Sequence, residues 1–182
     1  LNALYGPERD KAVDDEIHGG DGANQLLGGP GNDVLFGNAG DDRLFGGRDN
    51  DIIFGGRGND LVSGDIGDDE LYGDAGDDTV SGGAGDDMVY GGQGDDVVEG
   101  GDGDDVLSGD RGHDSLAGGA GDDVFVFKND GGADVIVDFA SGDVLQIQGG
   151  INGLEIGAPS DLLALISSDS LGNAVISLGD GN

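Results

Sequence analysis

The sequence contains no cysteine and no tryptophan, only 3 proline residues, and an aromatic content of 5%. Without cysteine the chain forms neither a disulfide nor a thiolate metal site, which suits an exported protein stabilised by metal as well as a cytosolic protein. No apolar run is long enough to cross a membrane as a helix, and the first residues show no signal-peptide pattern. With so few bulky apolar residues among 182, burial alone is too weak to stabilise a conventional globule.

Positive charge is also scarce. The chain has 7 lysine and arginine residues against 39 aspartate and glutamate residues, which gives a formal net charge of −32. Such a surface repels nucleic acid and anionic membranes, because both are bound through cationic patches. Neither H-E-x-x-H nor G-x-S-x-G occurs, and the two histidines lie far apart in the sequence. We therefore expect no nucleic-acid partner, no membrane span and no enzymatic activity in these residues.

Glycine, by contrast, is abundant, with 42 residues, and it recurs with a fixed period. Residues 19–126 form twelve consecutive nine-residue units with the pattern G-G-x-G-x-D-x-U-x, where U is a bulky apolar residue. The first position is always glycine, and the fourth is glycine in every unit except that of Asp49. The sixth is aspartate in every unit except the first, which has Asn24. Such self-similarity indicates a solenoid of stacked units.

Each position of the unit has a physical interpretation. We expect the first six residues to form a turn, in which glycine at positions one and four permits a positive φ. Where position two is not glycine, it is asparagine or aspartate, which best tolerate a left-handed conformation. The last three residues would form a short strand that points U inward. Two units would complete one coil, so that odd units stack on odd units and even on even. The resulting column of U residues is Leu26, Leu35, Leu44, Ile53, Val62, Leu71, Val80, Val89, Val98, Leu107, Leu116 and Phe125.

The position-six residues are the candidate metal ligands. Stacked turns would bring those of units n and n+2 near each other, with backbone carbonyls pointing between them. Calcium takes six to eight oxygen ligands, whereas zinc and copper favour sites built from cysteine or histidine. Twelve units offer ten same-side pairs, hence about ten calcium ions, and the pair that contains Asn24 should be the weakest. The predicted ligands are Asn24, Asp33, Asp42, Asp51, Asp60, Asp69, Asp78, Asp87, Asp96, Asp105, Asp114 and Asp123.

Two alternatives compete with this interpretation. A glycine-rich chain of extreme charge can be a disordered linker, and we expect that state in the absence of calcium. A disordered tract, however, does not need an apolar residue at the eighth position of twelve successive units. An EF-hand requires a twelve-residue loop closed by glutamate, and the five glutamates of this chain are not periodic.

The array resembles the RTX (repeats-in-toxin) nonapeptide family. The likeness covers residues 19–126 and is fullest in units such as 82–90 (GGAGDDMVY) and 91–99 (GGQGDDVVE). It implies an all-β, right-handed parallel β-roll that folds on binding calcium. It also implies export from Gram-negative bacteria through a type I apparatus, with an uncleaved C-terminal signal, and thus a location outside the cell or on its surface.

The flanking segments differ from the array. Residues 1–18 are interpreted as a lead with a degenerate capping repeat, since Asp15 and Ile17 occupy the sixth and eighth positions of a unit that lacks its glycines. Residues 127–182 are expected to form a small β-rich C-terminal cap with a short helix over 160–166 and a closing strand over 173–178. Residues 138–145 resemble the D-F-x-x-G-D-x-L segment that follows the roll in secreted RTX metalloproteases. Asp134, Asp138 and Asp143 offer carboxylates for a last cation site.

The outward positions of the strands distinguish two faces. Even units carry an aromatic column at position nine, formed by Phe36, Phe54, Tyr72 and Tyr90. An apolar face of a few hundred Å² often marks an interaction site, which favours self-association or a docked partner. The alternative is that the rings pack along the strand ladder, or under the chain's own tail. His18 and His113 are interpreted as a strand-end residue and a solvent-facing turn residue.

The sequence thus predicts a calcium-binding structural module of a secreted bacterial protein. One alternative is a self-assembling or adhesive subunit of a surface layer or extracellular fibre. Another is the non-catalytic C-terminal module of a secreted enzyme, because RTX arrays accompany metalloproteases, lipases and polysaccharide epimerases. The chain begins with Leu1 and ends in Gly-Asp-Gly-Asn, so we expect it to be a module of something longer.

Overall fold

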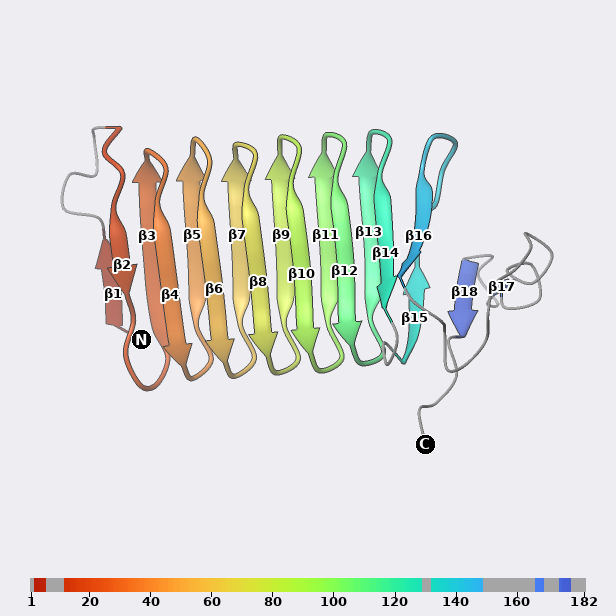
Figure 1. Ribbon diagram of the computed structural model, residues 1–182. Helices are drawn as coiled ribbons and strands as arrows, with labels where there is room; N and C mark the ends of the chain where they lie inside the picture. The colour runs from red at the N-terminus through yellow and green to blue at the C-terminus, as the bar shows by residue number, and fades with distance from the viewer. Residues whose placement is uncertain (1, 6–11, 129–131, 149–165, 169–173, 178–182) are drawn as a thin grey trace.

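The structure is a computed structural model that describes residues 2–5, 12–128, 132–148, 166–168 and 174–177, and these residues form strands and no helix (Figure 1). No helix in this part of the chain is therefore long and apolar enough to span a membrane. The strands are β1 (Asn2–Tyr5), β2 (Glu16–His18), β3 (Asn24–Pro30), β4 (Val34–Ala39), β5 (Arg43–Arg48), β6 (Ile52–Arg57), β7 (Leu61–Ile66), β8 (Glu70–Ala75), β9 (Thr79–Ala84), β10 (Met88–Gln93), β11 (Val97–Asp102), β12 (Val106–Arg111), β13 (Ser115–Ala120), β14 (Val124–Lys128), β15 (Ala133–Ile136), β16 (Val144–Gln148), β17 (Ile166–Ser168) and β18 (Ala174–Ser177).

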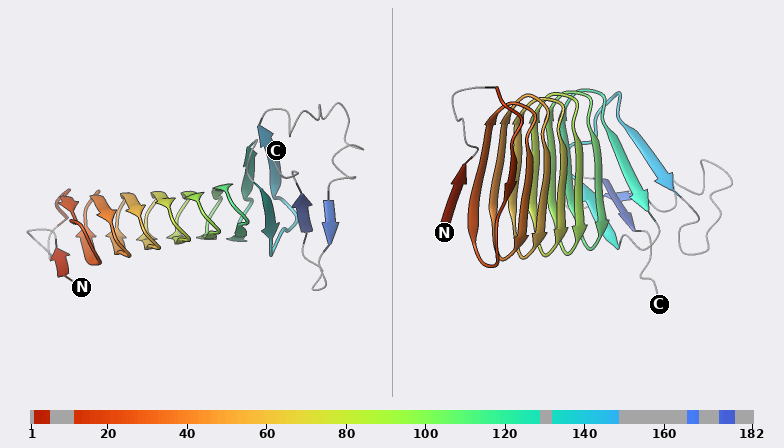
Figure 2. Two further views of the ribbon diagram at one scale, coloured as in Figure 1. Left: turned by 90° about the horizontal axis from the view of Figure 1, so that it is seen from below. Right: turned by 60° about the vertical axis from the view of Figure 1, so that its left-hand side comes forward.

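The strands belong to two sheets that face each other across the core (Figures 1 and 2). The first, here called the odd sheet, has the order β1-β3-β5-β7-β9-β11-β13-β15-β18-β17, and the second, the even sheet, has the order β16-β14-β12-β10-β8-β6-β4-β2. Within the array each strand pairs in parallel with the strand two units away, as Leu71 with Val89. One coil therefore contains eighteen residues, and the predicted parallel β-roll is confirmed.

The strands are longer than the sequence predicts. A repeat strand such as β4 has six residues rather than three, and it includes positions one to three of the next unit. The ladder pairs Asn38 with Gly56 in the same register as Phe36 with Phe54. Backbone hydrogen bonds carry this pairing, so glycine continues the strand although it has no side chain to pack. The turn is correspondingly reduced to positions four to six.

Positive φ values occur at positions two and four but not at position one. Asn38, Asp65, Asp74 and Asp110 have φ between 69° and 77°, as expected for asparagine and aspartate at position two. Asp49 replaces the position-four glycine and adopts a φ of 71°. No position-one glycine of the array has a positive φ, so the prediction for that position is wrong. A close approach of neighbouring oxygens, described below, requires glycine there instead.

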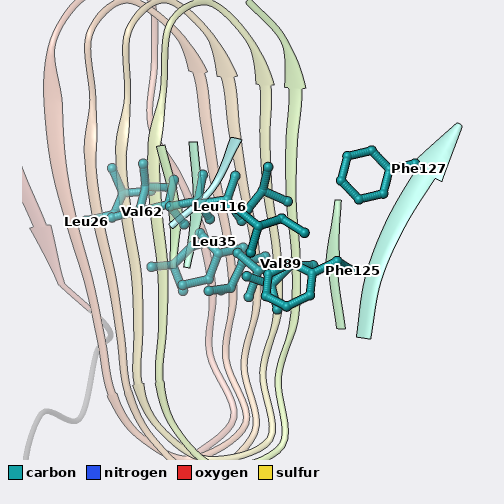
Figure 3. Packing of buried hydrophobic residues seen from close by; sticks show 14 of the residues in the cluster. Leu26, Leu35, Val62, Val89, Leu116, Phe125 and Phe127 are labelled. Atoms are coloured by element: carbon teal, nitrogen blue, oxygen red, sulfur yellow. The ribbon is translucent and has the colours of Figure 1, made fainter. Parts of the chain in front are cut away.

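The core is a single apolar layer between the two sheets (Figure 3). All twelve U residues are completely buried, which confirms the predicted column. Each unit contributes one of them, because alternation along the strand places position nine outside and the position-one glycine inside. Ile17, Phe127 and Ile136 extend the same cluster beyond the array.

The ends of the roll continue the ladder with altered spacing. At the N-terminal end β2 pairs with β4, which places Ile17 beside Leu35, and β1 pairs with β3. At the other end β15 and β16 pair in parallel with β13 and β14, twenty residues apart rather than eighteen. β18 then pairs with β15 in antiparallel fashion, so the predicted closing strand is present. The helix predicted over 160–166 lies outside the described residues except for Ile166, which begins β17.

Candidate metal centre

The position-six residues lie in the three-residue turns between the two sheets. All eleven aspartates of the predicted set are at most 3% exposed, and Asn24 is 5% exposed. The turns above and below cover them, because the amide of position seven donates to the position-six carbonyl one coil earlier, as from Ile52 to Asp33 at 2.9 Å. The stacking of the turns thus buries an ionisable group in every unit.

One carboxylate oxygen of each aspartate is hydrogen-bonded to the neighbouring coil. The amide of Asp33 donates to Oδ1 of Asp51 at 2.7 Å, and that of Asp42 donates to Oδ1 of Asp60 at 2.8 Å. The same bond joins each predicted pair of position-six residues, from Asn24 with Asp42 to Asp105 with Asp123, at 2.7 to 3.0 Å. The pairing that the sequence predicts is therefore present, but an amide contacts a carboxylate rather than two carboxylates facing each other.

The other carboxylate oxygen has no hydrogen-bond partner. A buried charge without a partner costs several kcal/mol in a folded protein, at least by order of magnitude. Among the described residues this condition recurs in ten of the twelve units, all except the first and the last. The unpaired buried atoms are Oδ2 of Asp33, Asp42, Asp51, Asp60, Asp69, Asp78, Asp87, Asp96, Asp105 and Asp114.

The position-one glycine lies beside this free oxygen. A Cβ built on Gly28 would lie 2.7 Å from the carbonyl oxygen of Gly46 and closer still to Oδ2 of Asp33. A carbonyl and a carboxylate oxygen thus converge on space that any other residue would fill. The same pair of oxygens surrounds each position-one glycine from Gly28 to Gly100, whereas the aspartate alone crowds Gly109 and Gly118.

This donor set fits a hard cation. Within the described residues no three histidine, cysteine, aspartate or glutamate side chains converge on one point. The oxygens available to a cation are therefore carboxylate Oδ2 atoms together with backbone carbonyls, which is the chemistry that calcium prefers and zinc does not.

Burial raises the pKa of these aspartates. The pKa of Asp51 rises to about 8, that of Asp87 to about 7 and that of Asp69 to about 6, from an ordinary value of 3.8. Loss of hydration is the largest cause, and neighbouring aspartates add repulsion, while the amide hydrogen bond partly offsets both. Without a bound cation, the folded turns therefore disfavour the charged form of their own side chains.

Asn24 occupies the same place without a charge. Its Oδ1 lies beside Gly19 and accepts a hydrogen bond from the amide of Gly20 at 3.0 Å. Its Nδ2 donates to the carbonyl oxygen of Gly22 and so removes one oxygen from the turn. Both features agree with the expectation that its site is the weakest, which stays a prediction.

The C-terminal cap supplies further aspartates in the same role. Oδ1 of Asp134 accepts a hydrogen bond from the amide of Asp114 at 3.1 Å, and Oδ1 of Asp143 accepts one from Asp123 at 3.2 Å. Asp138 instead accepts hydrogen bonds from the amides of Gly118 and Gly119. The three carboxylates therefore accept hydrogen bonds from different parts of the last coil of the array, and a single last cation site stays a prediction. The sequence offers Asp134 and Asp143 as ligands, but the repeat spacing does not predict their partners, because two extra residues separate each pair.

A second hydrogen-bonded ladder runs along the exposed position-five residues, a role that the sequence did not reveal. The amide of Asn50 donates to Oδ1 of Asn32 at 2.9 Å, and that of Asp86 donates to Oδ1 of Asp68 at 3.1 Å. This direction is opposite to that of position six. His113 takes the same part, because its Nδ1 accepts a hydrogen bond from the amide of Ala133 at 3.1 Å. Its exposure agrees with the predicted turn position.

The four aromatic residues of the even sheet form one continuous stack. Ring centroids lie 5.2 Å apart for Phe36 and Phe54, 5.0 Å for Phe54 and Tyr72, and 5.0 Å for Tyr72 and Tyr90. His18, at the end of β2, adds a fifth ring 4.6 Å from Phe36. Packing along the ladder, one of the two interpretations left open, is therefore present, and a docked partner or second copy stays a prediction.

Comparison with known families agrees with this geometry. The model of the RTX calcium-binding nonapeptide repeat matches residues 14–35, 27–62, 36–71, 63–98 and 99–127. The chain belongs to the RTX calcium-binding repeat family. No curated protein matches the chain. The RTX roll is thus a calcium-binding structural module, and the repeat that defines the family is not catalytic by itself.

Asp87→Asn is expected to weaken calcium binding by at least about tenfold at its turn. Substitution of a residue that only hydrogen-bonds to a metal ligand already lowers metal affinity by that factor, and Asp87 is proposed to bind the ion directly. The substitution replaces a free Oδ2 by an NH₂ donor. Asp86→Asn is the matched control, because it removes the same charge from an exposed position and keeps the Oδ1 that accepts from Asp104. Isothermal titration with calcium measures both variants, and equal losses would contradict the assignment.

Without calcium, the folded RTX chain is expected to be more stable near pH 5 than near pH 8. The pKa of Asp78 and Asp96 is about 7 in the folded chain against an ordinary value of 3.8, so the folded state binds more protons than the unfolded state in this window. This contribution to stability is therefore fully present below about pH 4 and is lost as the pH rises from there to about 7. Circular dichroism in chelator measures it.

Salt provides the control for this pH effect. About 0.5 M NaCl screens repulsion between exposed charges but not the burial of a carboxylate. Added salt near pH 8 should therefore not restore the β signal. A signal that is independent of pH, or that salt alone restores, would show that desolvation of the position-six residues is not the cause.

Proposed function

We propose that this RTX roll is a calcium-loaded structural module of a secreted bacterial protein, which remains unfolded at the low calcium of the cytosol and folds at the millimolar calcium outside the cell. The row of unpaired, buried Oδ2 atoms is the observation that carries the proposal. Each such atom leaves the folded turn incomplete unless a cation joins it.

The proposed ligands are the position-six residues of the array together with backbone carbonyls. At Gly28, the site would use Oδ2 of Asp33 and the carbonyl oxygen of Gly46, and this pattern repeats coil by coil. We propose about ten ions, one for each unpaired Oδ2. They would add about +20 to the formal charge of −32 and leave about −12, so the loaded chain stays anionic.

Calcium and folding are coupled through linkage. The carbonyl and carboxylate oxygens of one turn come from units eighteen residues apart, and an unfolded chain does not hold them together. A ligand that binds only the folded state contributes its binding free energy to folding. Export before folding, through a type I apparatus, is consistent with such a chain. Its parent would then supply any catalytic activity, as in the secreted metalloproteases, lipases and epimerases that carry similar arrays.

Circular dichroism of the purified chain tests this proposal. Titration from excess chelator to a few millimolar calcium should produce a cooperative gain of β signal. Magnesium at the same concentration should not, because it dehydrates reluctantly and demands a tighter octahedral geometry. Identical spectra in chelator and in millimolar calcium would refute the proposal.

Self-association through the even sheet is a second candidate function. It is favoured by Ile52 and Met88, apolar residues on the strands of the aromatic column that are 36% and 44% exposed, and by Val144 at the end of the same sheet, which is 50% exposed. Such a surface suits a subunit of an extracellular layer or fibre, with Phe36, Phe54, Tyr72 and Tyr90 at its centre.

Sedimentation velocity in the presence of calcium tests self-association by measuring the size of the sedimenting species. A double variant with Phe54→Ser and Tyr72→Ser should sediment as a smaller species, because it removes the centre of the apolar face, while calcium uptake is retained. Phe45→Ser is the control, since Phe45 has the same repeat position on the odd sheet. Unchanged sedimentation of the double variant would exclude this surface as the contact.

A further inference from the structure

Two hollows lie side by side along the outer face of the even sheet. The larger has a volume of about 420 Å³ and is lined by Tyr72 and Tyr90 on one side and by Gln93 and Arg111 on the other. The smaller has a volume of about 360 Å³ and is lined in the same way by Phe36, Phe54 and Arg57. Both volumes are within the range of small-ligand sites.

The hollows arise from an alternation at position two. On the even sheet this position is Asn38, Gly56, Asp74, Gly92 and Asp110 in successive coils. The glycines form the floors, and the three polar side chains form the partitions, with Asp74 shared by both hollows. The floors lie two coils apart, which is about 9.6 Å at ordinary strand spacing. The result is a track parallel to the axis of the roll rather than an isolated pocket.

Charge is nearly balanced along the two hollows, on a chain whose net charge is −32: three cations line them against two carboxylates, because Asp74 is shared. The larger contains two carboxylates, of Asp74 and Asp110, and two cations, of Arg111 and Lys128. Lys128 forms an ion pair with Asp110 at 2.6 Å and lies 5.5 Å from the ring centroid of Tyr90. The smaller contains Asp74 and Arg57. Such a lining offers both donors and acceptors, with one surplus cation over the two hollows.

The aromatic wall presents mainly ring edges. Because the rings stack on one another at about 5 Å, their faces are covered, and the last open face, that of Tyr90, is under Lys128. Ring edges carry the positive part of the aromatic quadrupole and therefore favour contact with oxygen atoms. The wall thus combines apolar surface with a preference for oxygen.

We propose that this track binds a neutral polysaccharide, with one stretch of sugar residues in each hollow. A sugar ring presents oxygen atoms to the ring edges of the aromatic wall, and its hydroxyl groups both donate and accept hydrogen bonds, which carboxylates, guanidinium groups and Gln93 satisfy. The spacing of the hollows is comparable to the length of a disaccharide in an extended chain. An acidic polysaccharide would meet only one surplus cation in these hollows and is repelled by the rest of a surface whose net charge is −32.

Proline-rich peptides are the competing occupant, because they also bind along aromatic grooves. Those grooves are built for apolar rings, whereas charged groups surround both hollows here on the side opposite the aromatic wall. The polar lining therefore favours a hydroxyl-rich ligand.

Isothermal titration of the calcium-saturated chain with cellohexaose, xylohexaose and mannohexaose tests the proposal, with hexagalacturonate and decaproline for comparison. At least one neutral hexasaccharide should bind. Gly92→Asn should weaken that binding by at least about tenfold, since its side chain fills the larger hollow. Asn38 occupies position two on the same sheet with a φ of 77°, whereas Gly92 has a φ of 118° and a Cβ there would meet the backbone of Asp74, so the variant requires a local shift toward the Asn38 conformation.

Gly83→Asn is the matched control, because Gly83 holds position two on the odd sheet, where no aromatic column accompanies it. Its affinity for the sugar should be unchanged. If Gly92→Asn fails to fold in calcium, the amide chemical shifts of the unaltered chain decide, since those of Gly92 and Gln93 should move on addition of the sugar. Binding of none of the three neutral sugars, binding only of hexagalacturonate or decaproline, or equal loss in both variants would overturn the proposal. Calcium-dependent folding is measured separately and can succeed when this proposal fails.

Discussion

An unpaired carboxylate oxygen, buried at nearly every turn, is the constraint on which the rest of this structure depends. Aspartates of neighbouring coils are separated by about one strand spacing, where two charges repel by roughly 3 kcal/mol at an effective dielectric of about 20. Each unit opposes this repulsion with one buried apolar side chain, which contributes about 1.5 to 3 kcal/mol. Burial therefore does not prevail on its own, and the balance favours folding only when cations neutralise the turns.

The same constraint explains why the strand and the turn cannot vary independently. Gly46 belongs to strand β5, and its carbonyl oxygen is also one of the oxygens beside Gly28. The ladder that aligns the strands thus sets the position of a metal ligand, and the hydrogen bond to Oδ1 directs the free Oδ2 of the same carboxylate. A one-residue slip would move both the U column and the ligands, so the metal and the core select the same register.

Much of this organisation could be predicted from the sequence, because a strict period states which residues stack. The U column, the two alternating sheets and the pairing of position-six residues all follow from the nine-residue period. What could not be predicted depends on contacts between coils. Glycine at position one reflects the approach of Gly46 O and Asp33 Oδ2 rather than its own φ. Strand length depends on backbone pairing through glycines, and the cap residues Asp134 and Asp143 lie off the period.

The two faces of the RTX roll can differ because the outward side chains contact neither the apolar core nor the proposed metal sites. Position eight fills the core, positions one and six build the turns, and position four requires a left-handed backbone. Positions seven, nine and three point outward from the sheets and contribute to none of these, and position two also points outward although its backbone is left-handed. At position nine the even sheet carries Tyr72 and Tyr90, whereas the odd sheet carries Ser63 and Ser81. Because nothing in folding demands this asymmetry, and because the rings line hollows with nearly balanced charge, the outer face of the even sheet is where a function beyond calcium binding would be encoded.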